Sequence, residues 1–181
     1  MPRRTPHRPS YLLASLALAV LHPATTAAQD AKAAVTSFIE ERADRYGSVA
    51  QRIWDLAEVG YHETESAALL AATLHEEGFD VEMGVGGMPT AFVARWGQGR
   101  GPVIGILAEY DALPGISQGR TPERAPVAHQ IAGHACGHHL FGSGSAAAAA
   151  ATKAWMEQSG QAGEIRVYGT PAEEGGAGKV Y

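Results

Sequence analysis

The heptapeptide GHACGHH (133–139) gathers three of the chain's eight histidines and its single cysteine. Only one residue separates Cys136 from His138, so in a turning backbone both side chains can face one ion or two neighbouring ions. A thiolate and an imidazole suit Zn²⁺ or another divalent first-row metal, and the amino end of a helix would favour the thiolate. A buried inert cysteine and a cysteine nucleophile are the alternatives. We interpret His134 and His139 as orienting or packing histidines outside the ligand set.

Two adjacent carboxylates, Glu173 and Glu174, follow a predicted strand in the segment PAEEGG. Because consecutive side chains diverge at a strand end, one can bind metal while the other takes a proton from water. A solvated acidic turn is the alternative, although a nearby cysteine–histidine site favours a ligand and a base. Asp111, in EYDALPG, is expected either to orient the metal-binding histidine or to cap a turn.

Helices must come first in the chain, because apolar residues recur at helical spacing before the strands begin. The pattern predicts a helix over 33–47 ended by Gly47, a second over 48–60 capped by Ser48, and a third over 63–78 ended by Gly78. A fourth, rich in alanine, is predicted over 143–160, where small side chains let it lie flat against a sheet.

Short apolar runs rich in valine and isoleucine predict the strands. They cover 79–85, 90–97, 102–110 and 163–170. The run 102–110 is apolar almost throughout, which is typical of a central strand covered on both faces. Helices followed by alternating strands and helices indicate an α/β layered fold, with the candidate residues at strand and helix ends where sites of such folds lie.

The first 28 residues predict a secretory signal, because a start with three arginines is followed by an apolar run over 11–21 and by small residues. We expect cleavage near Ala28 and a periplasmic or secreted protein. The net charge of −5, with no basic run, excludes attraction to nucleic acid or to anionic lipid. A single cysteine cannot form an internal disulfide.

Three ordered motifs carry a family resemblance: AEYDALPGI (108–116), GHACGHHLFG (133–142) and GTPAEEGGAGKVY (169–181). Together with WDLAEVGYHETESA (54–67) they resemble the amidohydrolase branch of the aminoacylase and carboxypeptidase metallopeptidase family. This branch includes hippurate hydrolase-like members, and the resemblance is greatest to its p-aminobenzoyl-glutamate hydrolase-like members. The resemblance implies a three-layer α/β catalytic domain with a mixed sheet, of which residues 29–181 are the N-terminal part.

The resemblance also implies roles for single residues. It makes Cys136, His138 and Glu174 metal ligands and Glu173 the general base. Two divalent ions, Mn²⁺ or Zn²⁺, would serve hydrolysis of an amide bond in an N-acyl or N-aroyl amino acid. The family's further histidine ligands and its lid and dimerisation domain, which implies a homodimer, have no counterpart in these 181 residues. We therefore expect the 1–181 chain alone to bind metal poorly and to be inactive.

Three other functions stay open on the sequence. A dipeptidase or carboxypeptidase of the same family is one, and a non-catalytic remnant acting as a binding module is another. The third is a cysteine-dependent acyl hydrolase, whose activity would resist a chelator and be lost on thiol alkylation.

Overall fold

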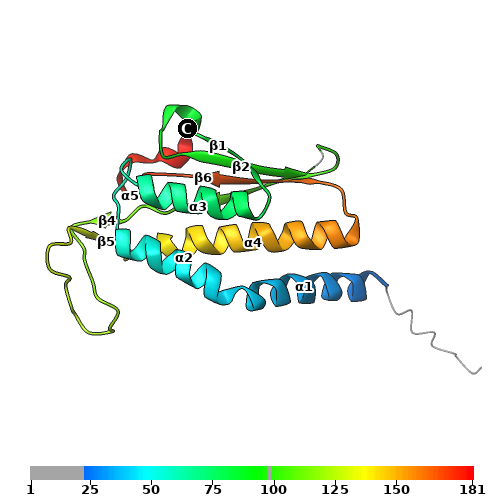
Figure 1. The fold of residues 1–181 in the computed structure, drawn as a ribbon, viewed down its shortest axis with the longest axis horizontal. Helices are drawn as coiled ribbons and strands as arrows, with labels where there is room; N and C mark the ends of the chain where they lie inside the picture. The colour runs from blue at the N-terminus through cyan, green and yellow to red at the C-terminus, as the bar shows by residue number, and fades with distance from the viewer. Residues whose placement is uncertain (1–22, 98) are drawn as a thin grey trace, which may run out of the picture.

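The computed structural model describes residues 23–97 and 99–181 (Figure 1). The helices are α1 (Pro23–Glu41), α2 (Ala43–Leu56), α3 (Thr64–Glu76), α4 (His138–Ser159) and the short α5 (Glu173–Gly176), with 3₁₀ turns η1 (Val85–Gly87) and η2 (Gly178–Val180). The strands are β1 (Asp80–Met83), β2 (Phe92–Gly97), β3 (Val103–Ala108), β4 (Leu113–Pro114), β5 (Ala132–Gly133) and β6 (Glu164–Gly169). The predicted signal and its apolar run lie largely outside this part of the chain and stay predictions.

Four strands form one mixed sheet in the order β1-β2-β6-β3. β2 pairs antiparallel with β1 and β6, whereas β3 runs parallel to β6, with Ala108 opposite Gly169 at their carboxyl ends. The mixed sheet confirms the predicted α/β class. All four predicted strands form, because each is a short β-branched run bounded by glycine, proline or polar residues.

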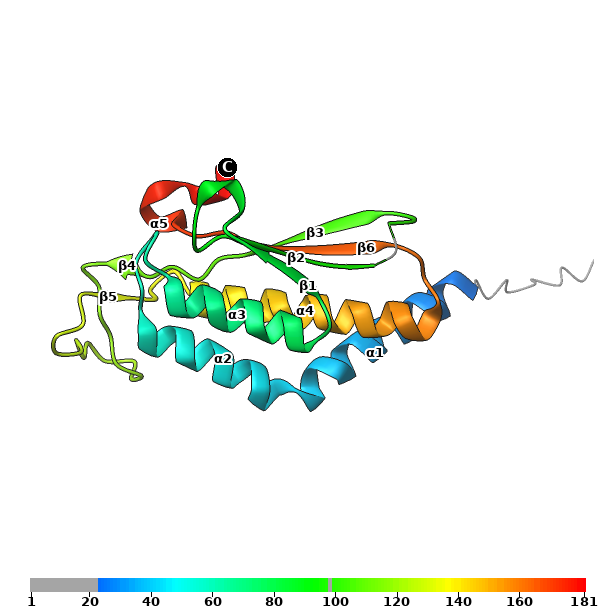
Figure 2. The ribbon, with the colours of Figure 1, turned by 45° about the horizontal axis from the view of Figure 1, so that its top comes forward.

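The helices α1 to α4 all lie on the same face of this sheet (Figure 2). α3 and α4 are next to the strands, and α2 and α1 pack on α4 from the outside. Two hydroxyls fix α4 in place: Ser145 donates to the carbonyl of Leu107 at 2.7 Å, and Ser143 donates to the carbonyl of Tyr46 at 2.6 Å. Five of the alanines of α4 are buried, as their small size predicts: Ala146, Ala147, Ala149, Ala150 and Ala151. No helix in the described residues is long and apolar enough to cross a membrane.

The predicted break between the first two helices is wrong. The chain breaks at Arg42 instead of Gly47, and α2 continues through Ser48. Ser48 does not cap a helix, because its hydroxyl donates to the carbonyl of Asp44 one turn earlier at 2.7 Å. Tyr46, Val49 and Ile53 lie on the buried face of this single helix, and their burial outweighs the weak helix propensity of one glycine.

The predicted central position of strand 102–110 is also wrong for the described chain. β3 pairs only with β6 and lies at an edge of the sheet. Val103 and Ile104 are half exposed there. An apolar run predicts a strand well, but its position in the sheet depends on partners that the run does not specify.

Candidate metal centre and active site

Three chain segments converge at the carboxyl end of the parallel pair β3–β6. Glu109 follows β3 directly, His138 begins α4, and Glu173 begins α5 after β6. The backbone N–H of Thr170 donates to the carbonyl of Ala108 at 2.9 Å, so the strand ends stay side by side. At the entry to α4, Gly137 has a φ of +85°, a left-handed conformation that favours glycine. This is the edge at which ligands bind in open α/β sheets.

The buried carboxylate of Asp111 joins two of these segments. One oxygen, Oδ1, lies 2.9 Å from Nδ1 of His138, and the other, Oδ2, accepts the backbone N–H of Glu174 at 2.8 Å. The hydrogen bond to Asp111 raises the pKa of His138 and outweighs the opposite effect of burial. Of the two roles that the sequence left open for Asp111, the structure favours the orientation of His138. Nε2 of this ring then faces the acidic groups opposite.

Two carboxylates lie around Nε2 of His138. Oε2 of Glu109 is 3.1 Å away and Oε2 of Glu173 is 3.8 Å away. One ligand atom from each of the three residues lies within 4.8 Å of the others. An imidazole held at Nδ1 by the carboxylate of Asp111, with the carboxylates of Glu109 and Glu173 near its Nε2, is a donor set that fits a divalent cation.

Lys179 neutralises part of this negative charge. Its Nζ lies 3.0 Å from Oε1 of Glu109 and 2.9 Å from Oε1 of Glu173. These hydrogen bonds, to Glu173 and then to Glu109, raise the pKa of Lys179. The ammonium binds the oxygens that point away from His138, so it holds the two carboxylates side by side and leaves their Oε2 atoms toward the ring.

The predicted ligands Cys136 and Glu174 lie on the other side of His138. Oε1 of Glu174 is 3.8 Å from Nδ1, the nitrogen that Asp111 occupies, and the exposed thiol of Cys136 lies near the Glu174 side chain. The Glu174 carboxylate raises the pKa of the Cys136 thiol, whereas a helix amino end was expected to favour the thiolate. Within the described residues, Cys136, His138 and Glu174 do not form a cluster as tight as that of Glu109, His138 and Glu173. Their assignment as ligands stays a prediction.

His134 and His139 pack together beside Trp54, which agrees with their interpretation as packing histidines. Their ring centroids are 5.0 Å apart, and the ring of Trp54 meets His139 edge-on at 4.9 Å. Nε2 of His134 lies 3.0 Å from the carbonyl of Ile53. Burial lowers the pKa of His134 to about 4, so the ring is neutral at physiological pH.

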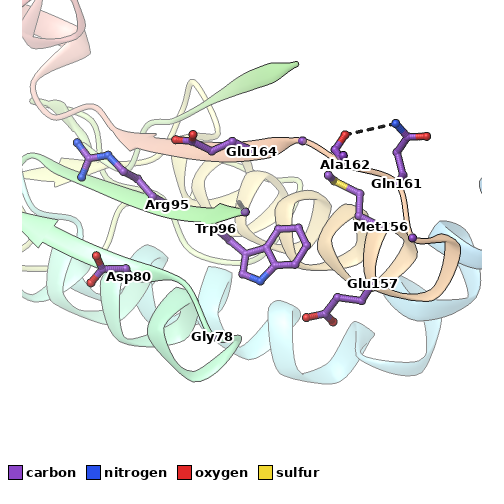
Figure 3. Close-up of a pocket in the computed structure, with 12 residues that line it drawn as sticks. Gly78, Asp80, Arg95, Trp96, Met156, Glu157, Gln161, Ala162 and Glu164 are labelled. Carbon is purple, nitrogen blue, oxygen red and sulfur yellow. Dashed lines mark hydrogen bonds between the residues drawn. The ribbon is translucent and has the colours of Figure 1, made fainter. Parts of the chain in front are cut away.

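A hollow of about 820 Å³ lies at the opposite end of the sheet and does not include any of these residues (Figure 3). Trp96, Met156 and Glu164 line it, where β2 ends and β6 begins. The acidic cluster is at the other end of β6, so this hollow is not part of the candidate site.

Sequence reasoning missed two residues of the site, Glu109 and Lys179, although both lie inside the three motifs that carry the family resemblance. Glu109 had a usable signal, because it immediately follows a strand and precedes Asp111 by two residues, the same strand-end placement that singled out the glutamate pair. No local sequence signal marked Lys179, because only the turn of α5 brings its ammonium back to the carboxylates of Glu109 and Glu173.

The fold and this site define a metallohydrolase-like α/β domain, and comparison with known proteins agrees. The model of Peptidase family M20/M25/M40 matches residues 105–181, which include all three motifs. The chain belongs to this family.

Two curated relatives illustrate the similarity. The chain is 47% identical to a subunit of the p-aminobenzoyl-glutamate hydrolase of Escherichia coli (strain K12), over 79% of this chain and 30% of that protein. It is 34% identical to the Xaa-Arg dipeptidase of Homo sapiens, over 78% of this chain and 32% of that protein. The chain thus spans about a third of the length of the curated relatives that it matches.

Among solved structures, the fold is similar to that of a dinuclear metal binding peptidase of the M20 family from Bacillus subtilis. The TM-score is 0.52 at 27% sequence identity, and the match covers 70% of this chain and 35% of that chain.

Proposed function

We propose that the complete natural protein containing this chain hydrolyses an amide bond in N-acyl or N-aroyl amino acids, with divalent metal at the site described above. The observation that carries the proposal is the group formed by Glu109, His138 and Glu173, with Asp111 behind the imidazole. The similarity to the p-aminobenzoyl-glutamate hydrolase of Escherichia coli suggests the class of substrate. The family resemblance supports two ions, Mn²⁺ or Zn²⁺, and a homodimer, and the signal predicted over residues 1–28 supports a periplasmic or secreted location.

The side chains of the site have separate roles in the proposed reaction. Bound divalent ions polarise a carbonyl group and lower the pKa of water. Asp111 holds the His138 ring with Nε2 toward Glu109 and Glu173. His138 would bind an ion, and Cys136 and Glu174 would provide further ligands. Glu173 is partly exposed, so it can reach a water molecule, take its proton and pass that proton to the leaving amine.

The position of Glu173 beside Glu109 gives the general-base assignment a sharp test. The test is metal analysis and kinetics of the complete natural protein and of Glu173→Gln, with p-aminobenzoyl-glutamate and N-acyl amino acids as substrates. We expect Glu173→Gln to keep its metal and to lose about 100- to 10,000-fold in kcat. Exposed Glu123 provides the control Glu123→Gln, which should change neither the metal content nor kcat. A Glu173→Gln protein that retains its activity would exclude Glu173 as the base, and one that loses its metal would make Glu173 a ligand.

A second candidate is a dipeptidase, which the 34% identity to the Xaa-Arg dipeptidase supports. Xaa-Arg dipeptides therefore belong in the same substrate screen, and faster turnover of these dipeptides than of aroyl amino acids would favour this candidate. A cysteine-dependent hydrolase would keep its activity in EDTA and lose it to a thiol alkylator. Absence of turnover with every substrate, in metal-loaded protein, would favour the binding module.

A further inference from the structure

Glu63 is a completely buried acidic residue that the proposed reaction does not use. It precedes α3, and none of its surface is exposed. Within the described residues it has no ion-pair partner among lysines, arginines or histidines. A buried carboxylate without a cation is costly unless hydrogen bonds satisfy its oxygens. The atoms that satisfy Glu63 therefore indicate what it is for.

Both oxygens of Glu63 have partners in other segments of the chain. Oε1 accepts the backbone N–H of Ala172 at 2.7 Å, and Oε2 accepts the hydroxyl of Thr90 at 3.1 Å. The carbonyl of Thr90 in turn accepts the hydroxyl of Tyr110 at 2.6 Å, and Tyr110 lies between Glu109 and Asp111. The carboxylate is thus connected to the segments that carry the site acids.

Ala172 sets the direction of the backbone that carries Glu173 and Glu174. It directly precedes Glu173, it is buried, and it adopts a left-handed φ of +55°, which is unfavourable for a residue with a side chain. Its carbonyl accepts the N–H groups of Gly176 and Gly178, at 2.9 and 3.3 Å. Since Glu63 binds the N–H, both polar backbone groups of Ala172 are fixed, and so is the direction in which the chain enters α5.

Neighbours of Glu63 contact the same turn. A Cβ atom on Gly60 would lie 2.9 Å from Cα of Ala172, so only glycine allows this approach. The hydroxyl of Tyr61 donates to the carbonyl of Gly176 at 3.1 Å. The connection between α2 and α3, distant in sequence from the acids, therefore holds both ends of α5.

We propose that Glu63 is a positioning residue for the reaction: its buried carboxylate binds the N–H of Ala172 and thereby fixes the turn that directs Glu173 and Glu174 toward His138. The inference rests on the proposed function for its catalytic consequence. Its structural part, the order of residues 170–178, can be measured without activity.

The experiment compares Glu63→Met, Glu63→Gln and Thr90→Val in the complete natural protein. Methionine is similar in length but cannot accept the N–H of Ala172, whereas the glutamine carbonyl can, with its amide nitrogen facing the Thr90 hydroxyl. Thr90→Val removes only the second partner. The measurements are kcat, KM and amide hydrogen exchange of peptides covering 170–178 and α4.

For Glu63→Met we expect kcat to fall about 10- to 100-fold with KM within about two-fold, because misplaced reacting groups lower kcat. Exchange over 170–178 should rise about ten-fold while exchange in α4 is unchanged. Glu63→Gln should restore both properties and Thr90→Val should keep them. A folded Glu63→Met protein with wild-type exchange and kcat would overturn the inference, as would a glutamine variant as impaired as the methionine variant.

If Glu63→Met does not fold, Glu63→Asp replaces it. Aspartate keeps the charge but is one methylene too short to reach Ala172, so exchange over 170–178 should again rise, and wild-type exchange would overturn the inference. Failure of the proposed function looks different: the wild-type protein then shows no hydrolysis, while the exchange effects of the Glu63 variants persist.

Discussion

The carboxylate of Asp111 lies 2.9 Å from Nδ1 of His138, and this single contact decides which ring nitrogen faces the acidic cluster. The same carboxylate accepts the N–H of Glu174 at 2.8 Å. Asp111 therefore fixes the orientation of the imidazole and the start of α5 together, and it does so with both oxygens.

Asp111→Asn tests this double contact. An asparagine has one acceptor oxygen, so its amide nitrogen must face either the N–H of Glu174 or the ring of His138. We expect affinity for Zn²⁺ or Mn²⁺ to fall about 10- to 100-fold, the range for loss of a group that orients a ligand. Competition with a chromogenic chelator measures it. Exposed Asp55 gives the control Asp55→Asn, and equal affinities of the two variants would contradict the role of Asp111.

Lys179→Gln should strengthen metal binding. The ammonium of Lys179 is the cation closest to Glu109 and Glu173 in the described structure, and it would repel a divalent ion bound at His138 beside these carboxylates. Its removal should tighten binding of Zn²⁺ or Mn²⁺ about 3- to 10-fold, since the lysine is partly exposed and its field is screened. Isothermal titration calorimetry measures this, with Lys153→Gln in the distant half of α4 as control. Weaker binding by Lys179→Gln would show instead that the lysine organises the ligands.

Tyr46 predicts a loss of stability at alkaline pH. Burial raises the pKa of its phenol well above the usual value, and Glu77, which accepts its hydroxyl at 3.2 Å, adds to the shift. A pKa raised in the folded state means that the stabilisation is complete below the unfolded pKa of about 10 and is lost as pH rises above it, by up to about 1.4 kcal/mol per pH unit. Urea denaturation between pH 8 and pH 11 measures the free energy of unfolding of wild type and of Tyr46→Phe. The difference between the two proteins isolates the effect of Tyr46, because the other groups titrate in both. Parallel curves would contradict the prediction.

The sequence predicted the elements of this fold well where a local pattern determines them. The strands at 79–85 and 163–170 and the alanine helix all form, because β-branched runs and small helix-forming residues act locally. The predicted helix end at Gly47 was wrong, because burial of the helix face that includes Tyr46 is a tertiary effect. The edge position of β3 was missed for the same reason.

The site was predictable to the extent that its residues end strands or begin a helix. Those rules pointed to Glu173, His138 and Asp111, and the structure brings these three together. They did not point to Lys179 or Glu63. Lys179 contacts Glu109, which is 70 residues away in the chain, and Glu63 contacts Ala172, which is 109 residues away. Such contacts depend on how the segments after β3 and β6 and before α3 come together, which no local pattern encodes.

Gly142 determines how closely α4 approaches the acidic cluster, and Gly144 on the same helix provides a matched control. A Cβ atom at Gly142 would lie 2.6 Å from the carbonyl oxygen of Glu109 and 2.9 Å from Leu70, whereas one at Gly144 would meet nothing within 4 Å. Gly142→Ala must therefore push the helix away from the backbone of Glu109, and we expect it to cost about 1–3 kcal/mol of stability.

Since α4 carries His138, the same shift moves Nε2 away from Glu109 and should also weaken metal binding. Gly144→Ala should instead be neutral or stabilise the protein by up to about 1 kcal/mol, because alanine is the better helix former. Thermal denaturation and chelator competition on both variants measure the two effects. Equal stability of the two variants would show that α4 does not pack against Glu109 as closely as the structure has it, and the distance of 3.1 Å between His138 and Glu109 would then lose its support.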